Sequence, residues 1–353
     1  MEPSASDLKI AFIDRDGTLI FEPPDTRQID LVGKVRILPG VVDGLNRLKE
    51  EGYRFVMISN QDGRGTSSFP EEGFQRAQRK FIDLLKERGI EFYRILICPH
   101  FAEDNCTCRK PKTGLVDDFL KQEKVNLEQS IMIGDRDADM EFARNVGVWA
   151  VRMQTNGSFP RLASVDRMTE ETDVFVQCNL DGTGRFQIET DIKFFNHMLE
   201  QLSKHSLIDL RVKAQGDSDM DEHHLVEDIG LTLGQTLSKA LGSREGIFRY
   251  GFLLPMDDTL AEVAFDLGGR PYLVFNCEFE RERVGDLPTE MIEHFFRSFS
   301  DSLRANIHIN VRYSRNEHHK AEAIFKACGR ALRMACERDD RMGGALPSTK
   351  GVL

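Results

Sequence analysis

Short apolar runs alternate with longer amphipathic segments over the first part of the chain. The apolar runs have the length and composition of buried strands, and they cover residues 10–14, 54–60, 94–99, 131–135 and 148–153. The segments between them carry apolar residues at helical spacing, and they cover residues 42–52, 74–89, 116–124 and 140–147. This alternation predicts an α/β domain over residues 1–153, built as a doubly wound parallel sheet with helices on both faces.

The pattern changes after this domain. Residues 154–168 are polar, contain Gly, Pro and Ser and show no clear period, so we expect a linker. Residues 169–353 then show the order strand, strand, helix, strand, helix twice. The first strand pair, within residues 172–190, predicts a hairpin with DGTG at its turn. The helices are expected at 195–205, 223–241, 290–305 and 317–336. We therefore expect a duplicated half-domain that forms an α+β sandwich.

Composition narrows the possible classes of function. The 353-residue chain has a formal net charge of −11, with 58 acidic against 47 basic side chains. This balance is unfavourable for binding nucleic acid or an anionic membrane surface, so we expect neither partner. No apolar run is long enough to span a bilayer and the first residues lack a secretory signal, which favours the cytoplasm. Because disulfides are rare there, the seven cysteines are first considered as metal ligands.

Carboxylates follow the predicted strands of the first domain. DRDGTL begins at Asp14 and continues to Asp16, and GDRDADM contains Asp135. Because the carboxyl ends of parallel strands meet at one edge of a sheet, these side chains should converge there with Ser59. Carboxylate oxygens suit Mg²⁺, a carboxylate can attack phosphorus, and a lysine from RKPKTG would neutralise a phosphate. Asp139, also in GDRDADM, is a further candidate. The alternative is that the aspartates are only turn residues or, for Asp139, a helix cap.

The segments DRDGTL, SNQDG, RKPKTG and GDRDADM, in this order, resemble the haloacid-dehalogenase superfamily of phosphatases. The resemblance implies Asp14 as the nucleophile and Asp16 as the general acid and base. It implies a Mg²⁺ ion held by Asp14, Asp135 and the main-chain carbonyl of Asp16. The residues implied to hold the phosphoryl group and its charge are Ser59, Asn60 and Lys110. The spacing leaves no room for a large cap domain, which suits a small phosphorylated substrate.

Four candidate metal ligands lie in one short loop before Lys110. Cys98, His100, Cys106 and Cys108 offer three sulfurs and one imidazole, a closed tetrahedral set typical of structural Zn²⁺. The alternative is a group of reduced cysteines without a metal. Bound zinc would fix the position of the lysine that follows. The loop resembles that of the histidinol-phosphate and heptose-bisphosphate phosphatases, so a heptose bisphosphate is an alternative substrate.

One short motif occurs twice in the second domain, as HHLVED from His223 and as HHKAEA from His318. Residues four apart share a helix face, so the first histidine and the glutamate point together, whereas the second histidine is turned by about 100°. Each half-domain would then give two ligands to one metal and one to another, and manganese, zinc or iron would suit them. The candidate ligands are His197, His223, His224, Glu227, His294, His318, His319 and Glu322. The alternative is a set of surface or core histidines without a metal.

The last 185 or so residues closely resemble the imidazoleglycerol-phosphate dehydratases. The resemblance rests on segments such as MTEETDV, LDGTG, FNHMLEQLSKHSLIDL, MIEHFF, NEHHKAEAIFKA and LPSTKGVL. It implies two Mn²⁺ ions and Glu171 as the candidate for proton transfer. The residues implied to bind substrate phosphate are Arg249, Arg270, Ser348 and Lys350. His205 has no counterpart in the repeat, so we expect a substrate contact or a structural residue.

The two domains together resemble the bifunctional histidine-biosynthesis proteins of some bacteria. This implies small phosphorylated imidazole substrates, namely L-histidinol phosphate for the first domain and D-erythro-imidazoleglycerol phosphate for the second. Members of the dehydratase family form large symmetric shells with sites between subunits, which implies a large homo-oligomer through the carboxy-terminal domain. A rival hypothesis makes the second domain a metal-binding assembly scaffold. Glu171 and the phosphate-binding residues argue against it, because a scaffold needs neither.

Overall fold

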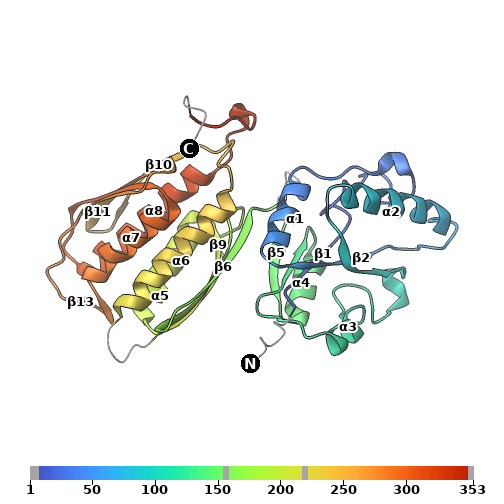
Figure 1. Cartoon of the computed structure of the whole chain (residues 1–353), viewed down its shortest axis with the longest axis horizontal. Helices are drawn as coiled ribbons and strands as arrows, with labels where there is room; N and C mark the ends of the chain where they lie inside the picture. Colours follow the sequence, from blue (N-terminus) through green and yellow to red (C-terminus); the bar gives the residue numbers. More distant parts are fainter. Residues whose placement is uncertain (1–7, 154–158, 217–221, 349–353) are drawn as a thin grey trace. The chain divides into compact units, whose positions relative to one another are not determined.

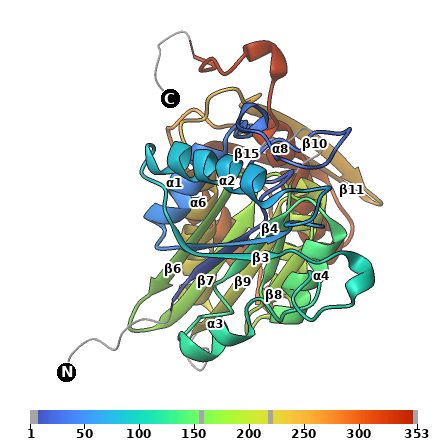
Figure 2. The ribbon, with the colours of Figure 1, turned by 90° about the vertical axis from the view of Figure 1, so that its right-hand side faces the viewer.

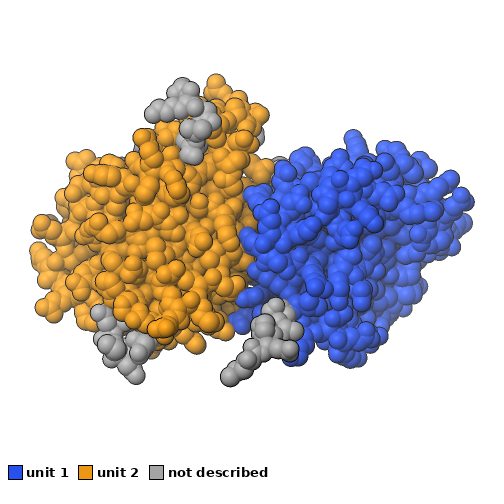
Figure 3. All heavy atoms as spheres, in the orientation of Figure 1, with its two compact units in different colours: residues 1–160 blue, residues 161–353 orange. Residues whose placement is uncertain are grey.

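The computed structural model describes residues 8–153, 159–216 and 222–348 (Figure 1). It divides the chain into two units, residues 1–160 and 161–353 (Figure 3). The first part of the expected linker, residues 154–158, lies outside the described residues. The second part is not a linker, because Leu162–Met168 forms strand β6 of the second unit.

The first unit contains one sheet of five parallel strands in the order β3-β2-β1-β4-β5. Its strands are β1 (Ile10–Ile13), β2 (Arg54–Asn60), β3 (Phe92–Cys98), β4 (Ile131–Gly134) and β5 (Trp149–Arg152). Its helices are α1 (Val41–Glu50), α2 (Glu71–Lys86), α3 (Asp117–Gln122) and α4 (Asp137–Val146), with 3-10 turns η1 (Val32–Lys34) and η2 (Ala102–Asp104). The order reverses between β1 and β4, as in a doubly wound sheet, so this prediction is confirmed.

Alternate residues of the buried strand β1 face opposite layers of helices. The Phe12 ring packs edge-on against Phe119 of α3 at 6.3 Å and against Phe142 of α4 at 6.2 Å. On the other face, the Gln78 amide of α2 contacts the sulfur of Met57 in β2. With both faces of the sheet covered, ligands have access only at the strand ends, and the carboxyl ends of β1, β2 and β4 carry the polar residues.

The second unit contains two four-stranded sheets with a layer of four helices between them (Figures 1 and 2). The first half contributes β6, β7 (Thr172–Asn179), β8 (Phe186–Glu189), α5 (Lys193–Ser206), β9 (Asp209–Gly216) and α6 (His223–Leu241). The second half contributes β10 (Tyr250–Met256), β11 (Thr259–Asp266), β12 (Tyr272–Asn276), β13 (Arg283–Val284), β14 (Leu287–Pro288), α7 (Glu290–Leu303), β15 (Asn306–Tyr313), α8 (Glu317–Cys336) and η3 (Asp340–Met342). The sheet orders, β6-β7-β9-β8 and β10-β11-β15-β12, are the same in sequence terms. The predicted duplication is confirmed.

The predicted hairpin over residues 172–190 is wrong, because β7 and β8 do not pair with each other. β7 pairs antiparallel with β6 and β9, whereas β8 runs parallel on the far side of β9. Asp209 explains this path, since its Oδ1 accepts hydrogen bonds from the backbone of Thr183 at 2.8 Å and Arg185 at 2.9 Å. The DGTG segment is therefore held across the end of β9 and delivers β8 to the outer edge.

The four helices pack in pairs that cross between the two halves. α5 lies against α8, and α6 lies against α7. Two glycines allow this close approach, because a Cβ on Gly329 of α8 would lie 2.7 Å from the carbonyl oxygen of Leu202. A Cβ on Gly234 of α6 would lie 2.8 Å from the carbonyl oxygen of Phe299. Helices from different halves therefore present their side chains to each other.

Candidate functional site

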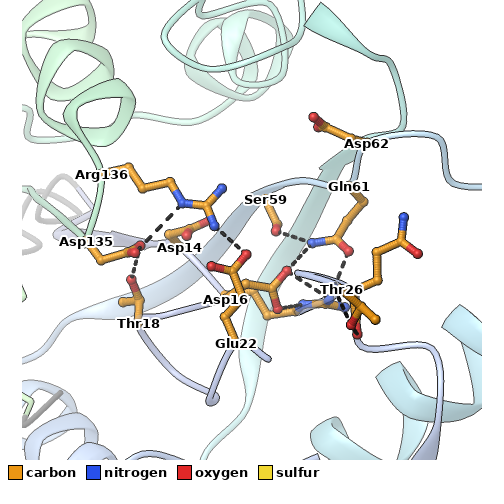
Figure 4. Close-up of polar contacts among 12 residues, drawn as sticks. Asp14, Asp16, Thr18, Glu22, Thr26, Ser59, Gln61, Asp62, Asp135 and Arg136 are labelled. Atoms are coloured by element: carbon orange, nitrogen blue, oxygen red, sulfur yellow. Dashed lines mark hydrogen bonds and ion pairs between the residues drawn. The ribbon is translucent and has the colours of Figure 1, made fainter. Parts of the chain in front are cut away.

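Carboxylates from two strand ends of the first unit converge at one point (Figure 4). Ligand oxygens of Asp14, Asp135 and Asp139 all lie within 4.8 Å of one another. Gly17 is required beneath them, since it has φ +76° and a Cβ there would lie 2.5 Å from Oδ2 of Asp135. The group joins the end of β1 to the start of α4, where Asp139 also accepts a hydrogen bond from the Arg136 backbone. Asp139 thus caps the helix and belongs to the cluster.

Lys110 reaches this cluster from the loop after β3. Its Nζ donates to Oδ1 of Asp14 at 2.6 Å and to Oδ1 of Asp139 at 2.5 Å, and all three side chains are buried. Burial raises the pKa of Asp14 to about 7, although the charge of Lys110 acts in the opposite direction. Burial lowers the pKa of Lys110, but the two carboxylates outweigh it and the net shift is upward. A buried carboxylate group of this kind fits a divalent cation, which would relieve the cost of its charge.

A buried hydrogen-bond network orients Asp16, the second aspartate of DRDGTL. Arg15 donates to both of its carboxylate oxygens, at 2.8 and 3.0 Å. Gln61 donates to Asp16 at 2.6 Å and to the hydroxyl of Ser59 at 2.7 Å, so Asp16 and Ser59 share one amide (Figure 4). Arg15 and Gln61 were not among the expected site residues, although they lie inside the motifs DRDGTL and SNQDG.

Asn60, an expected phosphoryl-binding residue, forms two hydrogen bonds to the backbone of Lys110. Its Oδ1 accepts from the Lys110 backbone nitrogen at 3.0 Å, and its Nδ2 donates to the Lys110 carbonyl oxygen at 3.2 Å. Both polar atoms of the Asn60 amide therefore bond to the same residue. The structure therefore places Asn60 where it positions the lysine.

The four zinc-ligand candidates lie together in the loop between β3 and Lys110. The three sulfurs of Cys98, Cys106 and Cys108 are 3.3 to 3.7 Å apart, and Nδ1 of His100 is 3.2 Å from the sulfur of Cys108. Zn–S bonds of about 2.3 Å place tetrahedral sulfur ligands about 3.8 Å apart, so the spacing fits one zinc ion. The loop is tied to the carboxyl end of β2, because Gln61 donates its backbone N–H to the Cys98 carbonyl oxygen at 2.7 Å.

Two further groups of possible metal ligands lie in the second unit, and each takes residues from both halves. One combines His197 of α5 with His318 and Glu322 of α8, and the other combines His223 and Glu227 of α6 with His294 of α7. Within each group the ligand atoms lie within 4.8 Å of one another. In the described part of the chain, the buried Nε2 of His294 has no hydrogen-bond partner, although it is 3.3 Å from Oε2 of Glu227. An imidazole nitrogen in this position fits a metal ligand.

The second histidine of each HH pair lies outside these two groups. Nδ1 of His224 is 3.2 Å from Oε2 of Glu171, and Nδ1 of His319 is 2.6 Å from Oδ1 of Asp258. The expected divergence of neighbouring histidines is therefore observed. Within the residues that the structure describes, neither side chain joins a metal-capable group of this chain.

The expected phosphate-binding residues are only partly brought together. Arg249 is ion-paired with Asp266 and its Nη1 donates to the carbonyl oxygen of Pro347 at 2.9 Å, which places it beside Ser348. Arg270 is exposed before β12. Lys350 lies outside the described residues. His205 is partly buried on α5, and this burial and the nearby Lys326 and Arg330 lower its pKa. Lys326 was not among the expected residues, and its Nζ lies 2.7 Å from Oε1 of Glu322.

The fold and these clusters define a two-domain enzyme with metal-capable sites in both units. A sequence model described as imidazoleglycerol-phosphate dehydratase matches residues 190–332, and one described as polynucleotide kinase 3 phosphatase matches residues 9–152. The "Histidine biosynthesis bifunctional protein HisB" of Campylobacter jejuni (strain 81-176) is 48% identical over 98% of this chain and 99% of its own. The protein of the same name from Legionella pneumophila (strain Lens) has the same identity and coverage. The chain belongs to this family of bifunctional histidine-biosynthesis proteins.

The imidazoleglycerol-phosphate dehydratase of Staphylococcus aureus is 38% identical, covers 50% of this chain and 99% of its own, and has a TM-score of 0.46. Family membership argues against the scaffold hypothesis and makes the chain an enzyme with a dehydratase domain and a phosphatase domain. Within the described residues, no helix is long and apolar enough to cross a membrane.

Proposed function

We propose that the first unit hydrolyses L-histidinol phosphate to L-histidinol and phosphate, and that the second dehydrates D-erythro-imidazoleglycerol phosphate to imidazole-acetol phosphate. The main support is that each unit has its own metal-capable cluster, while relatives named for histidine biosynthesis match both units over almost their full length. A cytoplasmic location fits this role, and none of the seven cysteines, which all lie within the described residues, forms a disulfide.

In the phosphatase reaction, the Asp14 carboxylate attacks phosphorus while the bond to the substrate oxygen breaks. Asp16 donates the proton that the leaving alcohol needs, and it later takes a proton from the water that hydrolyses the acyl-phosphate. Free phosphate leaves and Asp14 is regenerated. The supporting observation is that Arg15 and Gln61 hold Asp16 in one orientation, with Ser59 on the same amide.

Charge in the phosphatase site is balanced by a lysine and a cation. Asp14, Asp135 and the main-chain carbonyl of Asp16 are the residues that would hold Mg²⁺, which supplies charge neutralisation for the phosphoryl group when bound. Lys110, already against Asp14, would contact the phosphoryl oxygens. Asn60 and a structural Zn²⁺ in the loop before Lys110 would keep this lysine in place.

In the dehydratase reaction, the hydroxyl on the carbon attached to the imidazole ring leaves, and Glu171 removes a proton from the next carbon. The resulting enol becomes the ketone, so one water is lost. The residues of the two groups, with His224 and His319, would hold two Mn²⁺ ions, which supply Lewis acidity toward the ring nitrogens when bound. Glu171 is suited to this role because its side chain is 56% exposed and it faces the motif that carries His224.

Substrate phosphate would bind at the basic residues near the chain end. Arg249, Arg270, Ser348 and Lys350 are the proposed set, with His205 as a further contact. The hydrogen bond from Arg249 to Pro347, the residue before Ser348, supports the inclusion of Arg249 and Ser348. Arg249 must then exchange part of its pairing with Asp266 for phosphate.

We propose that the second unit assembles with further copies of the chain into a large homo-oligomer. Each metal-capable group of the second unit has three ligands, and His224 and His319 lie outside both groups, beside Glu171 and Asp258. Histidines supplied by a neighbouring copy would complete both groups, since each chain has two to give. No nucleic-acid or membrane partner is proposed, because the net charge is −11.

The proposal is tested with the full chain, Mg²⁺ and Mn²⁺. Phosphate release from L-histidinol phosphate and ketone formation from imidazoleglycerol phosphate are measured for the unaltered chain, Asp14→Asn and His223→Ala. We expect each variant to lose one activity and keep the other, while a control, His308→Ala at an exposed position of β15, keeps both. Absence of ketone from an assembled, manganese-loaded sample contradicts the dehydratase assignment. Hydrolysis of a heptose bisphosphate in place of histidinol phosphate contradicts the phosphatase substrate.

A further inference from the structure

A carboxylate stands directly before the second strand of the first hairpin in each half of the second unit. Glu171 precedes Thr172, the first residue of β7, and Asp258 precedes Thr259, the first residue of β11. Both side chains face the second histidine of an HH pair, Glu171 at 3.2 Å from Nδ1 of His224 and Asp258 at 2.6 Å from Nδ1 of His319. The same contact therefore occurs twice.

The two contacts are equivalent in the duplicated fold. β7 and β11 each hold the second position of their sheet, between β6 and β9 in one and between β10 and β15 in the other. The two histidines stand at the second residue of α6 and the third residue of α8. The recurrence comes from the architecture of the repeat, so the Asp258 contact is not an accidental surface pairing.

The two carboxylates differ in how firmly they are held. Oδ2 of Asp258 accepts the backbone N–H of Arg315 at 2.9 Å, which leaves Oδ1 aimed at His319. The turn is also tied by the hydroxyls of Thr259 and Ser314, which are 2.7 Å apart. The side chain of Asp258 is 27% exposed against 56% for Glu171. Asp258 is thus anchored, whereas the carboxylate of Glu171 is open to solvent.

The histidine is held from the other side as well. Asn316 caps α8, and its Oδ1 accepts from the backbone N–H of His318 at 2.8 Å and of His319 at 3.4 Å. The start of the helix and the imidazole ring are therefore both fixed. A carboxylate on Nδ1 keeps the proton on that nitrogen and leaves Nε2 with its lone pair.

We propose that Asp258 is a positioning residue for the dehydratase site, which accepts the Nδ1–H of His319 and presents Nε2 of this ring to a metal. The proposal rests on the proposed function of the second unit. Glu171, at the equivalent place in the other half, has diverged into the residue that moves a proton. One position of the ancestral repeat thus serves orientation in one half and chemistry in the other.

The test measures manganese binding as well as rate. Asp258→Asn is the main variant, because its amide oxygen can still accept the Arg315 N–H while its NH₂ group faces Nδ1 and favours the wrong tautomer. Free Mn²⁺ is followed by electron paramagnetic resonance during titration of the full chain. Loss of a carboxylate behind a ligating histidine lowers metal affinity by about 10- to 100-fold. We expect this loss at one of two manganese equivalents, with activity restored by excess Mn²⁺.

Matched variants separate the possible outcomes. Asp257→Asn, at the exposed neighbouring position, should bind manganese as the unaltered chain does, and Asp258→Glu should recover part of the affinity. Glu171→Gln should bind both equivalents but remain inactive at any Mn²⁺ concentration. If Asp258→Asn and Asp258→Ala bind both equivalents with unchanged affinity, the positioning role is refuted while the proposed function stands. If the unaltered, assembled chain binds no manganese, the proposed manganese site fails and the positioning role fails with it.

Discussion

Removal of the Asn60 amide is expected to impair the phosphatase through Lys110. The amide makes two hydrogen bonds to the Lys110 backbone, at 3.0 and 3.2 Å. A neutral hydrogen bond contributes a net stabilisation of about 0.5–1.5 kcal/mol, so the pair contributes about 1–3 kcal/mol. Asn60→Ala removes this stabilisation from the backbone of Lys110, whose Nζ contacts Asp14 and Asp139.

The corresponding loss of rate follows from the same energies. If the whole stabilisation is needed to keep Lys110 in place during the reaction, Asn60→Ala lowers kcat by about 5- to 160-fold. Because both polar atoms of the Asn60 amide already bond the Lys110 backbone, KM should change far less than kcat. Asn145→Ala is the matched control, since this exposed amide donates a hydrogen bond to the Pro111 carbonyl oxygen at 2.9 Å.

Steady-state hydrolysis of L-histidinol phosphate is measured in a double-mutant cycle with Lys110→Ala. If Asn60 acts through Lys110, the asparagine variant costs little further rate once the lysine is absent. Fully additive losses, or a raised KM with an unchanged kcat, refute this reasoning and return Asn60 to the phosphoryl-binding role predicted from the sequence. Thermal unfolding of the same samples reports whether the first unit remains folded.

Two further outcomes follow from the contacts of each unit. Cys106→Ser should cost one equivalent of zinc per chain in elemental analysis and reduce phosphatase activity alone, and full zinc content would contradict the loop assignment. Burial opposes ionisation of Asp181, but Arg161 at 2.7 Å outweighs it and holds the pKa of Asp181 below 3.8. Its contribution to stability is thus present above about pH 4 and lost as pH falls through the lowered pKa. Asp181→Asn should destabilise the second unit by about 3–5 kcal/mol near neutral pH and weaken the acid dependence of its thermal unfolding, and an unchanged pH profile would contradict this.

Elements defined by their own residues could be predicted from the sequence. The range expected for β2, residues 54–60, and those for α6 and α8 agree with the structure. β6 was missed because Ser164, Asp166 and Arg167 give it a polar sequence without a clear period. Its strand conformation depends on its neighbour, since each residue from Leu162 to Met168 pairs with one of β7. The hairpin predicted over residues 172–190 was wrong for the same reason, namely a distant partner. Asp209, which redirects β8, lies 20 residues or more from β8 in the sequence.

The residues of the phosphatase and dehydratase sites likewise fall into those that could be predicted from the sequence and those that could not. The residues expected at the carboxyl ends of β1, β2 and β4 are together, because an apolar run followed by a polar residue marks such an end in the sequence itself. Arg15, Gln61 and Asp258 could not be recognised, since each acquires its role from a partner on another segment. Arg15 lies between two aspartates and resembles a solvated charge until its burial at 1% exposure is known.

The crossed pairing of helices has a consequence for the duplicated domain. Each three-residue group takes one histidine from one half and a histidine with its glutamate from the other. Neither half therefore carries a complete group, and a bound metal bridges α5 to α8 or α6 to α7. Metal binding lowers the free energy only of the state in which the ligands are together. A bound metal therefore stabilises the packing between the two halves as well as the site. Each half of the repeat thus needs ligands from the other half to bind its metals. This requirement keeps the fold and the ligands of both halves the same, while the carboxylates Glu171 and Asp258, which are not ligands of either group, have diverged.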